Sequence, residues 1–365
     1  MSSSALTPAA AKGLTVNSTA AFCVIDPPGF KQPEVAAPPA PAAAAAAADG
    51  KADAKRTEGA RAKKGTGASI EGAKIGGDFA ITKNPEWLAH RLGVWAKCAE
   101  KYAAEIAAKP KEAITITMPD GSTKEGVAFE TSPMDIAKGI SDGLARSCVI
   151  AKVKYAGAVD DGPKIASIEE DDDEADAEQD AQLWDMTRPL CGDCTLHLLK
   201  FSDKEGKEVF WHSSAHLLGM ALEHNFGGKL THGPALDSGF FYDCYMGGAA
   251  VGDKDWKALE KDVQGCVKKK APFERVVLSR EDALEMFRHN PFKLAIIESK
   301  IPAGGLTTCY KQGDFIDLCM GPHIPNAGVI KAFQVTRNSS AYWLGEADND
   351  SLQVLYLTSA FSVFY

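Results

Sequence analysis

Apolar residues recur at every third or fourth position in one early segment, which predicts an amphipathic helix. The apolar positions of this segment are Trp87, Leu88, Leu92, Trp95, Cys98, Tyr102 and Ile106. The helix is expected to begin at Asn84-Pro85-Glu86, because an amide N-cap, a first-turn proline and a first-turn acid all favour a helix N-terminus. Lys109-Pro110 ends it. Further helices are predicted at residues 212–224, 253–269 and 280–289.

Alternating apolar and polar residues predict a small sheet in the next part of the chain. The predicted strands cover residues 113–118, 127–129, 148–153, 183–185 and 196–201. A turn at residues 119–122 joins the first two strands, and Ser132-Pro133 predicts the entry of a helix. These elements indicate a β-grasp-like α+β domain at residues 112–202. Its acidic segment, residues 160–182, is expected to be a solvated loop.

The following residues predict a second, larger α+β domain at residues 203–353. Besides the helices named above, it is expected to contain strands in residues 233–243, 276–280, 310–317, 332–335 and 341–343. The fold class is therefore α+β, with a small β-grasp-like domain followed by a larger domain. Residues 78–111 are expected to form a helical extension before the first domain, and residues 354–365 a carboxy-terminal tail.

The first part of the chain lacks the variety of apolar residues that a folded core needs. Residues 1–77 are mostly Ala, Pro, Ser, Gly and Lys, and residues 42–48 are all alanine. A disordered leader is expected. A transit peptide is the alternative, but Lys12 is the only basic residue before Asp26, whereas transit peptides are rich in arginine. The cytoplasm is the expected location and an organelle the alternative.

Composition and charge exclude several classes of protein. No run of eighteen apolar residues occurs in the 365 residues, so no membrane span is expected. The nine cysteines lack the dense, regular spacing of a disulfide scaffold, which favours a reducing compartment. Cys191-Gly-Asp-Cys194 has the spacing of a redox motif without its usual context. The net charge of −9 disfavours nonspecific nucleic-acid binding, although a local basic groove can still bind RNA.

Two pairs of residues carry the candidate chemistry. His212 and His216 stand four positions apart in a predicted helix, so both imidazoles project from one face. About a hundred residues later, Cys319 and His323 flank a Gly-Pro turn. Together they supply three nitrogens and one sulfur, a ligand set that suits tetrahedral Zn²⁺. The same groups can instead hold water, and for the histidine pair alone a structural role is favoured.

Seven short motifs, in order over residues 84–353, resemble the amino-terminal half of threonyl-tRNA synthetases. The motifs are Met118-Pro-Asp-Gly121, Ser132-Pro-Met-Asp-Ile-Ala137, His212-Ser-Ser-Ala-His216, Gly239-Phe-Phe-Tyr-Asp243, Asn290-Pro-Phe-Lys293, Asp317-Leu-Cys-Met-Gly-Pro-His323 and Asn338-Ser-Ser-Ala-Tyr-Trp343. The first domain resembles the TGS module of that family. The second resembles its serine-editing domain, which is similar to the editing domain of alanyl-tRNA synthetases. The resemblance implies a threonine--tRNA ligase whose amino-terminal portion hydrolyses mischarged seryl-tRNA(Thr).

Such proofreading has a physical reason. A ligation pocket that accepts threonine cannot strongly reject serine, because one missing methyl group changes the binding free energy by only about 1–3 kcal/mol. A second, hydrolytic site must then admit the seryl ester and exclude the threonyl ester by its extra methyl group. Carried over by position, the resemblance implies that this site consists of His212, His216, Tyr242, Lys293, Asp317, Cys319 and His323.

The resemblance also implies a role for each of these residues. His212, as a neutral imidazole, would orient or deprotonate the attacking water. Lys293 would donate to the terminal ribose hydroxyl or stabilise the developing oxyanion. Tyr242 and Asp317 would bind polar groups of the substrate, with Asp317 holding the serine ammonium. The other members complete the polar wall of the site: His216, Cys319 and His323.

Cofactors and partners follow from the same resemblance. Editing in the threonyl family resembles a metal-free reaction, whereas alanyl-type relatives hold a metal, so zinc at His212, His216, Cys319 and His323 is the alternative. The expected partners are tRNA(Thr) and seryl-tRNA, and no membrane. ATP, Mg²⁺ and a further zinc belong to the class II catalytic core, which is expected after Gln353 and is absent from these residues. The homodimer interface of full-length members is expected in that core as well.

The match has departures, and other functions stay open. Met320 and Leu344 stand where the family usually has arginine, which removes two groups that can contact phosphate. One alternative function is a non-catalytic module that only binds tRNA or a synthetase. Another is a zinc-dependent, free-standing aminoacyl-tRNA deacylase.

Overall fold

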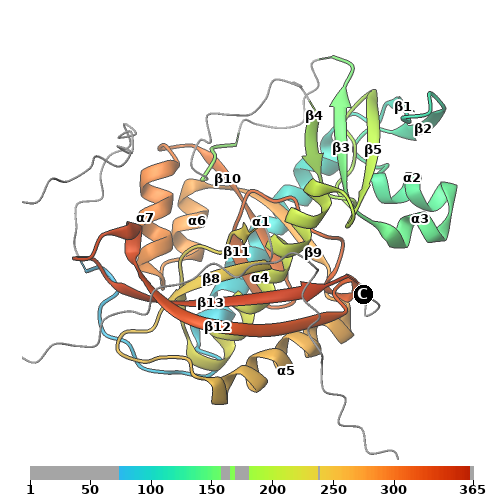
Figure 1. Ribbon diagram of the computed structural model, residues 1–365. Helices are drawn as coiled ribbons and strands as arrows, with labels where there is room; N and C mark the ends of the chain where they lie inside the picture. The colour runs from blue at the N-terminus through green and yellow to red at the C-terminus, as the bar shows by residue number, and fades with distance from the viewer. Residues whose placement is uncertain (1–73, 158–164, 169–180, 237–238, 362–365) are drawn as a thin grey trace, which may run out of the picture. The chain divides into compact units, whose positions relative to one another are not determined.

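The computed structural model describes residues 74–157, 165–168, 181–236 and 239–361 (Figure 1). Residues 1–73 of the expected leader and residues 160–164 and 169–180 of the expected acidic loop lie outside the described residues. The leader prediction is wrong for residues 74–77, which are docked on the second domain. The backbone N–H groups of Ile75 and Gly76 donate to the Asp350 carboxylate at 2.7 and 2.8 Å. Ile75 also packs against an apolar cluster that includes Phe292 and Trp343, but a single apolar residue in this segment gives no sign of docking in the composition.

The early helix is confirmed as α1 (Trp87–Ala108), and its buried face joins a core of the second domain. Its N-cap is Glu86 rather than Asn84, whose φ of 45° lies outside the right-handed helical region. Arg91 of α1 forms a buried ion pair with Glu223 of the second domain, with Nη1 2.8 Å from Oε1. The helical extension is therefore held against the second domain by a buried ion pair as well as by apolar packing.

A mixed sheet with two helices forms the first domain. Its elements are β1 (Ala113–Thr117), β2 (Thr123–Val127), α2 (Pro133–Ile140), α3 (Asp142–Ser147), β3 (Cys148–Tyr155), β4 (Ala181–Trp184) and β5 (Cys194–Lys200). The strand order is β2-β1-β5-β3-β4, and β1 and β5 are parallel while the other neighbours are antiparallel. Ser132 and Asp135 form a reciprocal capping box at the start of α2, which confirms the predicted helix entry.

The second domain contains two antiparallel sheets. Its elements are α4 (Lys204–Phe226), β6 (Lys229–Leu230), β7 (Ala235–Leu236), β8 (Gly239–Tyr245), α5 (Asp253–Lys269), β9 (Phe273–Ser279), α6 (Arg280–Met286), α7 (Pro291–Lys300), β10 (Leu306–Gln312), β11 (Phe315–Leu318), η1 (Ala327–Val329), β12 (Ala332–Tyr342), η2 (Trp343–Gly345) and β13 (Ser351–Ala360). One sheet has the order β12-β13-β8-β6, with β7 also paired to β8. The other has the order β11-β10-β9. The predicted α+β fold class is confirmed.

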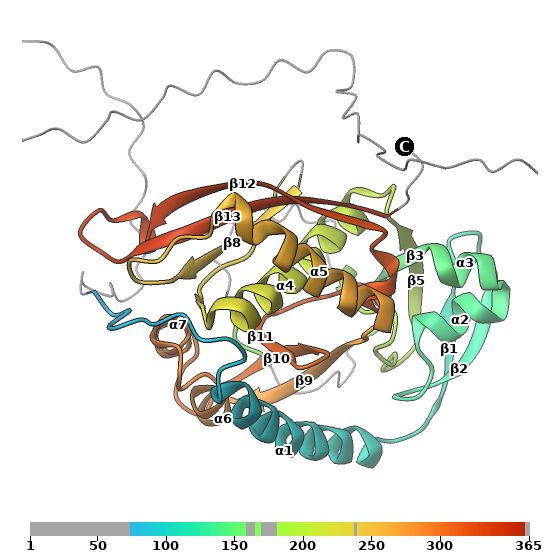
Figure 2. The same cartoon turned by 90° about the horizontal axis from the view of Figure 1, so that it is seen from below.

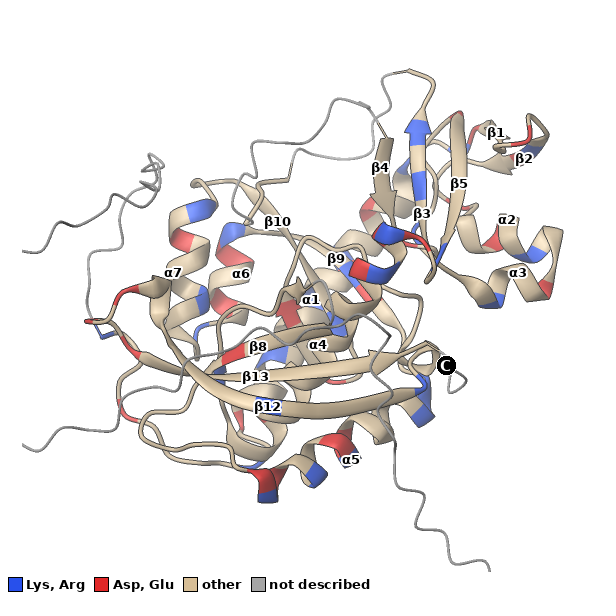
Figure 3. Ribbon diagram, in the orientation of Figure 1, with Lys and Arg blue, Asp and Glu red and all other residues tan. Residues whose placement is uncertain are grey.

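Helix α4 is the central element of the second domain. It lies between the two sheets, with α5 beside it (Figure 2). Apolar side chains on all of its faces are buried, as expected for a helix enclosed by other elements. It begins at Lys204 rather than at the predicted His212, because the charged residues of its first turns carry no apolar periodicity (Figure 3). In the described part of the chain, no helix is long and apolar enough to cross a membrane.

Other predicted boundaries also change. β12 is one continuous strand where two short strands were expected at 332–335 and 341–343. β13 runs across residue 353, and residues 353–357 pair with β8, so residues 354–360 belong to the sheet rather than to a separate tail. The sequence prediction omitted α7, although Asn290 caps it and Pro291 opens it, a recognisable start signal.

Candidate active site

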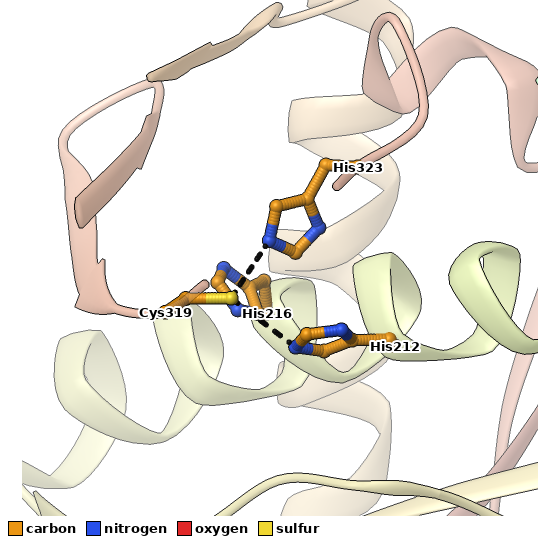
Figure 4. A group of neighbouring side chains, drawn as sticks. All are labelled: His212, His216, Cys319 and His323. Atoms are coloured by element: carbon orange, nitrogen blue, oxygen red, sulfur yellow. Dashed lines mark hydrogen bonds between the residues drawn. The ribbon is translucent and has the colours of Figure 1, made fainter. Parts of the chain in front are cut away.

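Helix α4 and the turn after β11 bring the four predicted imidazole and thiol groups together (Figure 4). The ring centroids of His212 and His216, both on α4, are 5.3 Å apart. The ring of His323 lies 4.8 Å from that of His212 and 4.2 Å from that of His216. Each of the three histidines and Cys319 offers one donor atom, and these atoms all lie within 4.8 Å of one another.

Gly321 shapes the turn that carries Cys319 and His323. Its φ of 73° lies in the left-handed region, where an L side chain is strained. A Cβ at this position would also lie 2.1 Å from the hydroxyl oxygen of Tyr310. The backbone N–H of Gly321 donates to Cys319 Sγ at 3.3 Å. The sulfur thereby comes to lie 3.4 Å from His212 Nε2 and 3.2 Å from His323 Nε2.

Ser213 determines which nitrogen of His323 carries the proton. The Ser213 hydroxyl donates to the carbonyl oxygen of Val209 at 2.7 Å, so its only proton is used. His323 Nδ1, 2.9 Å from Ser213 Oγ, must therefore be the donor in that contact. Ser213 Oγ also accepts the backbone N–H of Ile324 at 3.1 Å. With the proton on Nδ1, the lone pair of His323 Nε2 faces Cys319.

A second group of predicted residues adjoins the histidines. Lys293 from α7, Tyr242 from β8 and Asp317 from β11 are all buried. Lys293 Nζ lies 2.8 Å from Asp317 Oδ1, and the Tyr242 hydroxyl donates to Asp317 Oδ2. The same Oδ2 is 3.9 Å from His216 Nε2, which connects the two groups. The structure therefore brings all seven sequence-predicted residues into one site.

Burial controls the ionisation of this site. Desolvation lowers the pKa of His212 to about 4 and that of His216 to about 3, and it holds the pKa of His323 well below its ordinary value. All three imidazoles are therefore neutral at physiological pH. Burial is the largest single influence on the pKa of the Asp317 carboxyl and would raise it, but the charge of Lys293, the neighbouring His216 and the hydrogen bonds from Lys293 and Tyr242 together leave that pKa below its ordinary value. Burial and Asp317 raise the pKa of Tyr242, so its hydroxyl stays protonated.

The four donor groups fit zinc in type, and the two separations that involve the sulfur come close to it in length. Neutral imidazoles and a cysteine sulfur are ligands that zinc prefers. Tetrahedral zinc with bonds of about 2.3 Å to sulfur and about 2.05 Å to nitrogen would separate these two ligands by about 3.6 Å. The sulfur lies 3.4 Å from His212 Nε2 and 3.2 Å from His323 Nε2, so only small movements are needed. His216 Nδ1 is buried and has no hydrogen-bond partner among the described residues, which leaves a further donor atom for a metal.

Three residues that support the site were missed by sequence reasoning. Ser213 is part of the motif that contains the two α4 histidines, and its signal was a polar residue directly beside a candidate histidine. Tyr310 of β10 packs its ring 4.5 Å from that of His323. Asp185 belongs to the first domain, and it accepts hydrogen bonds from the Tyr310 hydroxyl and the His323 backbone N–H. No local pattern relates Asp185 to residues so distant in sequence.

The remaining sequence candidates lie elsewhere or stay outside the chemistry. Met320 is in the site turn, where its sulfur lies 3.8 Å from Thr308 Oγ. Leu344 is 53% exposed on the loop between β12 and β13. Burial raises the pKa of Cys194 to about 11, so little thiolate forms at neutral pH, which is the opposite of what a redox CxxC motif requires.

Two protein-family models match the chain. The TGS domain matches residues 114–200. The family described as threonyl and alanyl tRNA synthetase second additional domain matches residues 307–356. The second match contains Asp317, Cys319 and His323, whereas His212 and His216 come from α4, before the matched residues begin.

Curated relatives cover most of the chain. It is 42% identical over 280 residues to a probable cytoplasmic threonine--tRNA ligase 1 of Dictyostelium discoideum, covering 77% of this chain and 36% of that protein. It is 44% identical over 272 residues to the cytoplasmic threonine--tRNA ligase of Caenorhabditis elegans, covering 74% and 34%. It is 40% identical over 268 residues to a mitochondrial threonine--tRNA ligase 1 of Arabidopsis thaliana, covering 73% and 34%. The chain thus spans about a third of the length of these relatives.

Proposed function

The chain corresponds to the part of threonine--tRNA ligases that carries the TGS domain and the second additional domain, and on this premise we propose that it hydrolyses seryl-tRNA(Thr). The substrate is the ester between serine and the terminal ribose of tRNA(Thr). The products are free serine and uncharged tRNA. Such hydrolysis removes the serine that a threonine-specific ligation site accepts, because one methyl group changes discrimination by only about 10- to 200-fold.

The observation that carries this proposal is the arrangement of a neutral imidazole group beside a buried Lys293–Asp317 pair. His212 is the least buried of the three histidines, and it is the group that meets water from outside. It accepts a proton from that water as the oxygen adds to the ester carbonyl. The proton then passes to the ribose oxygen as the ester bond breaks. His216 and His323 hold His212 and the water in place.

Asp317 and Lys293 exchange partners when substrate binds. In the structure, Lys293 Nζ lies 2.8 Å from Asp317 Oδ1. The serine ammonium takes this position at the carboxylate, which leaves the ammonium of Lys293 as a buried cation that needs a new partner. Lys293 is then free to donate to the ribose hydroxyl or to the oxyanion of the tetrahedral intermediate. Tyr242, whose hydroxyl donates to Asp317 Oδ2, keeps the carboxylate oriented.

A zinc-dependent form of the same hydrolysis is the second candidate, and the cluster of four donor atoms favours it. His212 Nε2, His323 Nε2, Cys319 Sγ and one nitrogen of His216 would hold the ion. Bound zinc would polarise the ester carbonyl and lower the pKa of a bound water. Metal analysis of the purified chain separates the two forms. One zinc per chain with loss of hydrolysis in a chelator supports the zinc form, and full hydrolysis in the metal-free chain excludes it.

The wider role is also a proposal. We place the chain in threonyl-tRNA aminoacylation, with tRNA(Thr) as its partner and the cytoplasm as its location, since the relatives first named above are cytoplasmic. ATP-dependent ligation and dimerisation are proposed for the longer relatives.

Deacylation of purified seryl-tRNA(Thr) by the 365-residue chain tests the proposal. We expect hydrolysis above the spontaneous rate, and a loss of about 10²- to 10⁴-fold in His212→Ala, because general base catalysis contributes that much. Lys293→Ala should lose a comparable factor. His197→Ala, which changes an exposed histidine on β5, is the matched control and should behave as wild type. Binding of tRNA without turnover in the wild-type chain would instead support the non-catalytic module.

A further inference from the structure

A carboxylate of the first domain reaches the candidate active site of the second. Asp185 directly follows β4 and is only 6% exposed. Its Oδ2 accepts the hydroxyl of Tyr310 at 2.8 Å, and its Oδ1 accepts the backbone N–H of His323 at 2.8 Å. One side chain therefore ties strand β10 and the turn after β11 to the first domain.

Both hydrogen-bond partners of Asp185 lie in, or pack against, the turn that carries Cys319 and His323. The Tyr310 ring lies 4.5 Å from the His323 ring at an interplanar angle of 69°. The Tyr310 hydroxyl also packs against Gly321, where an added Cβ would lie 2.1 Å from its oxygen. The backbone N–H of His323 is the second point at which Asp185 holds this turn. Movement of Asp185 would therefore shift His323 and, through the turn, the sulfur of Cys319.

We infer that Asp185 is a positioning residue for hydrolysis at the second-domain site, which rests on the proposed function. It fixes Tyr310 and the backbone of His323, so that the imidazole and thiol face the α4 histidines at the observed distances. A displacement of this turn changes both the rate of the chemical step and the size of the space left for the amino-acid side chain.

The two domains do not depend on Asp185 to stay together. Val149 and Ile150 of β3 are fully buried in the same apolar core as Phe210 and Leu217 of α4. A hydrogen-bonded carboxylate adds no apolar burial to that contact. Asp185 is therefore better suited to orienting the turn than to joining the domains.

The test compares seryl-tRNA(Thr) and threonyl-tRNA(Thr) as substrates of the full chain. The ratio of their kcat/KM values does not depend on how much of a preparation is folded, so a purely structural defect leaves this ratio unchanged. We expect Asp185→Ala to lower kcat for the seryl substrate by about 10- to 100-fold, typical of lost support behind a reacting group. The seryl-to-threonyl ratio should fall as well.

Two variants sharpen the comparison. Asp185→Asn can still accept the His323 N–H through its amide oxygen, and its NH₂ group can donate to the Tyr310 oxygen. It should therefore restore most of the rate and the ratio. Asp193→Ala is the matched control, because Asp193 accepts the Thr115 N–H at 2.6 Å within the first domain and should leave both quantities at wild-type values.

Each outcome of these measurements either supports or overturns the role of Asp185. A wild-type ratio in Asp185→Ala would overturn the inference while leaving the proposed function intact. If that variant does not fold, Tyr310→Phe, which removes one hydrogen bond and keeps the ring, replaces it, and an unchanged ratio there has the same meaning. A wild-type chain that hydrolyses neither substrate would remove the proposed function and the inference together.

Discussion

Replacing Ser213 with alanine should disturb His323 more than its neighbours. Ser213 is fully buried on α4, and its oxygen accepts the Nδ1–H of His323 at 2.9 Å and the backbone N–H of Ile324 at 3.1 Å. Ser213→Ala leaves both donors buried without an acceptor. The carbonyl of Val209 loses only an extra donor, since it keeps its partner within the helix.

The size of the effect can be worked out from these contacts. A buried polar group without a hydrogen-bond partner costs about 1–3 kcal/mol, whether it is a donor or an acceptor, so the Ile324 N–H and the Nδ1 of His323 together cost about 2–6 kcal/mol in either tautomer. Alanine returns about 0.5 kcal/mol through its higher helix propensity. We therefore expect the free energy of unfolding to fall by about 2–5 kcal/mol. The proton of His323 should also move from Nδ1 to Nε2, where the sulfur of Cys319 is 3.2 Å away.

Ser214→Ala is the matched control for this prediction. Ser214 is equally buried on the same helix, and its hydroxyl donates to Phe210 O at 2.8 Å. Its side-chain partner among the described residues is the Ser359 hydroxyl, so no histidine is affected. Urea denaturation gives the free energies of unfolding, and ¹⁵N–¹H correlation spectra of the imidazoles give the tautomers. Equal losses of stability in the two variants, or an unchanged His323 tautomer in Ser213→Ala, would refute the role of Ser213.

Three further predictions concern stability. Burial lowers the pKa of His216 to about 3 and that of His289 to about 2, so these histidines take up protons at a higher pH in the unfolded chain than in the folded one. The free energy of unfolding, measured by urea titration, should therefore fall as the pH drops below about 6.5. Arg91→Leu should lower the free energy of unfolding by about 3–5 kcal/mol, because it leaves the Glu223 carboxylate buried and unpaired. The double variant Arg91→Leu with Glu223→Leu should recover most of this loss in the same urea titrations. Additive losses from the two substitutions would contradict the pairing. Burial raises the pKa of Asp243 to about 7, so the free energy of unfolding falls as the pH rises from about 4 to 7 and this carboxyl ionises more readily in the unfolded chain. Asp243→Asn should therefore be more stable than the wild type at about pH 8 but not at about pH 4. Equal thermal midpoints of the two proteins at about pH 8 would contradict this.

The parts of the site that the sequence predicts are those set by local geometry. His212 and His216 share a helical face because they are four residues apart, and Cys319 and His323 share one turn through Gly321. The seven residues as a set came from ordered motifs, not from spacing alone. Their meeting in one place depends on the packing of α4 between two sheets, which periodicity cannot establish.

The parts that it misses depend on contacts between distant residues. Asp185 is 125 residues from Tyr310 and 138 from His323, so no helical or strand spacing connects them. The docking of residues 74–77 uses backbone amides and the Asp350 carboxylate, which apolar composition does not reveal. The end of β13 was misjudged for a different reason: residues that depart from a family's sequence can still complete its sheet by backbone pairing.

The relative rates of hydrolysis of one mischarged and one correctly charged substrate test the central claim most directly. The 365-residue chain is mixed with seryl-tRNA(Thr) or threonyl-tRNA(Thr), and free amino acid is measured under single-turnover conditions. The proposed function predicts faster release of serine than of threonine, by about 10-fold or more, since one extra methyl group must be excluded. Release of both amino acids at the spontaneous rate, or at equal enzymatic rates, would contradict it.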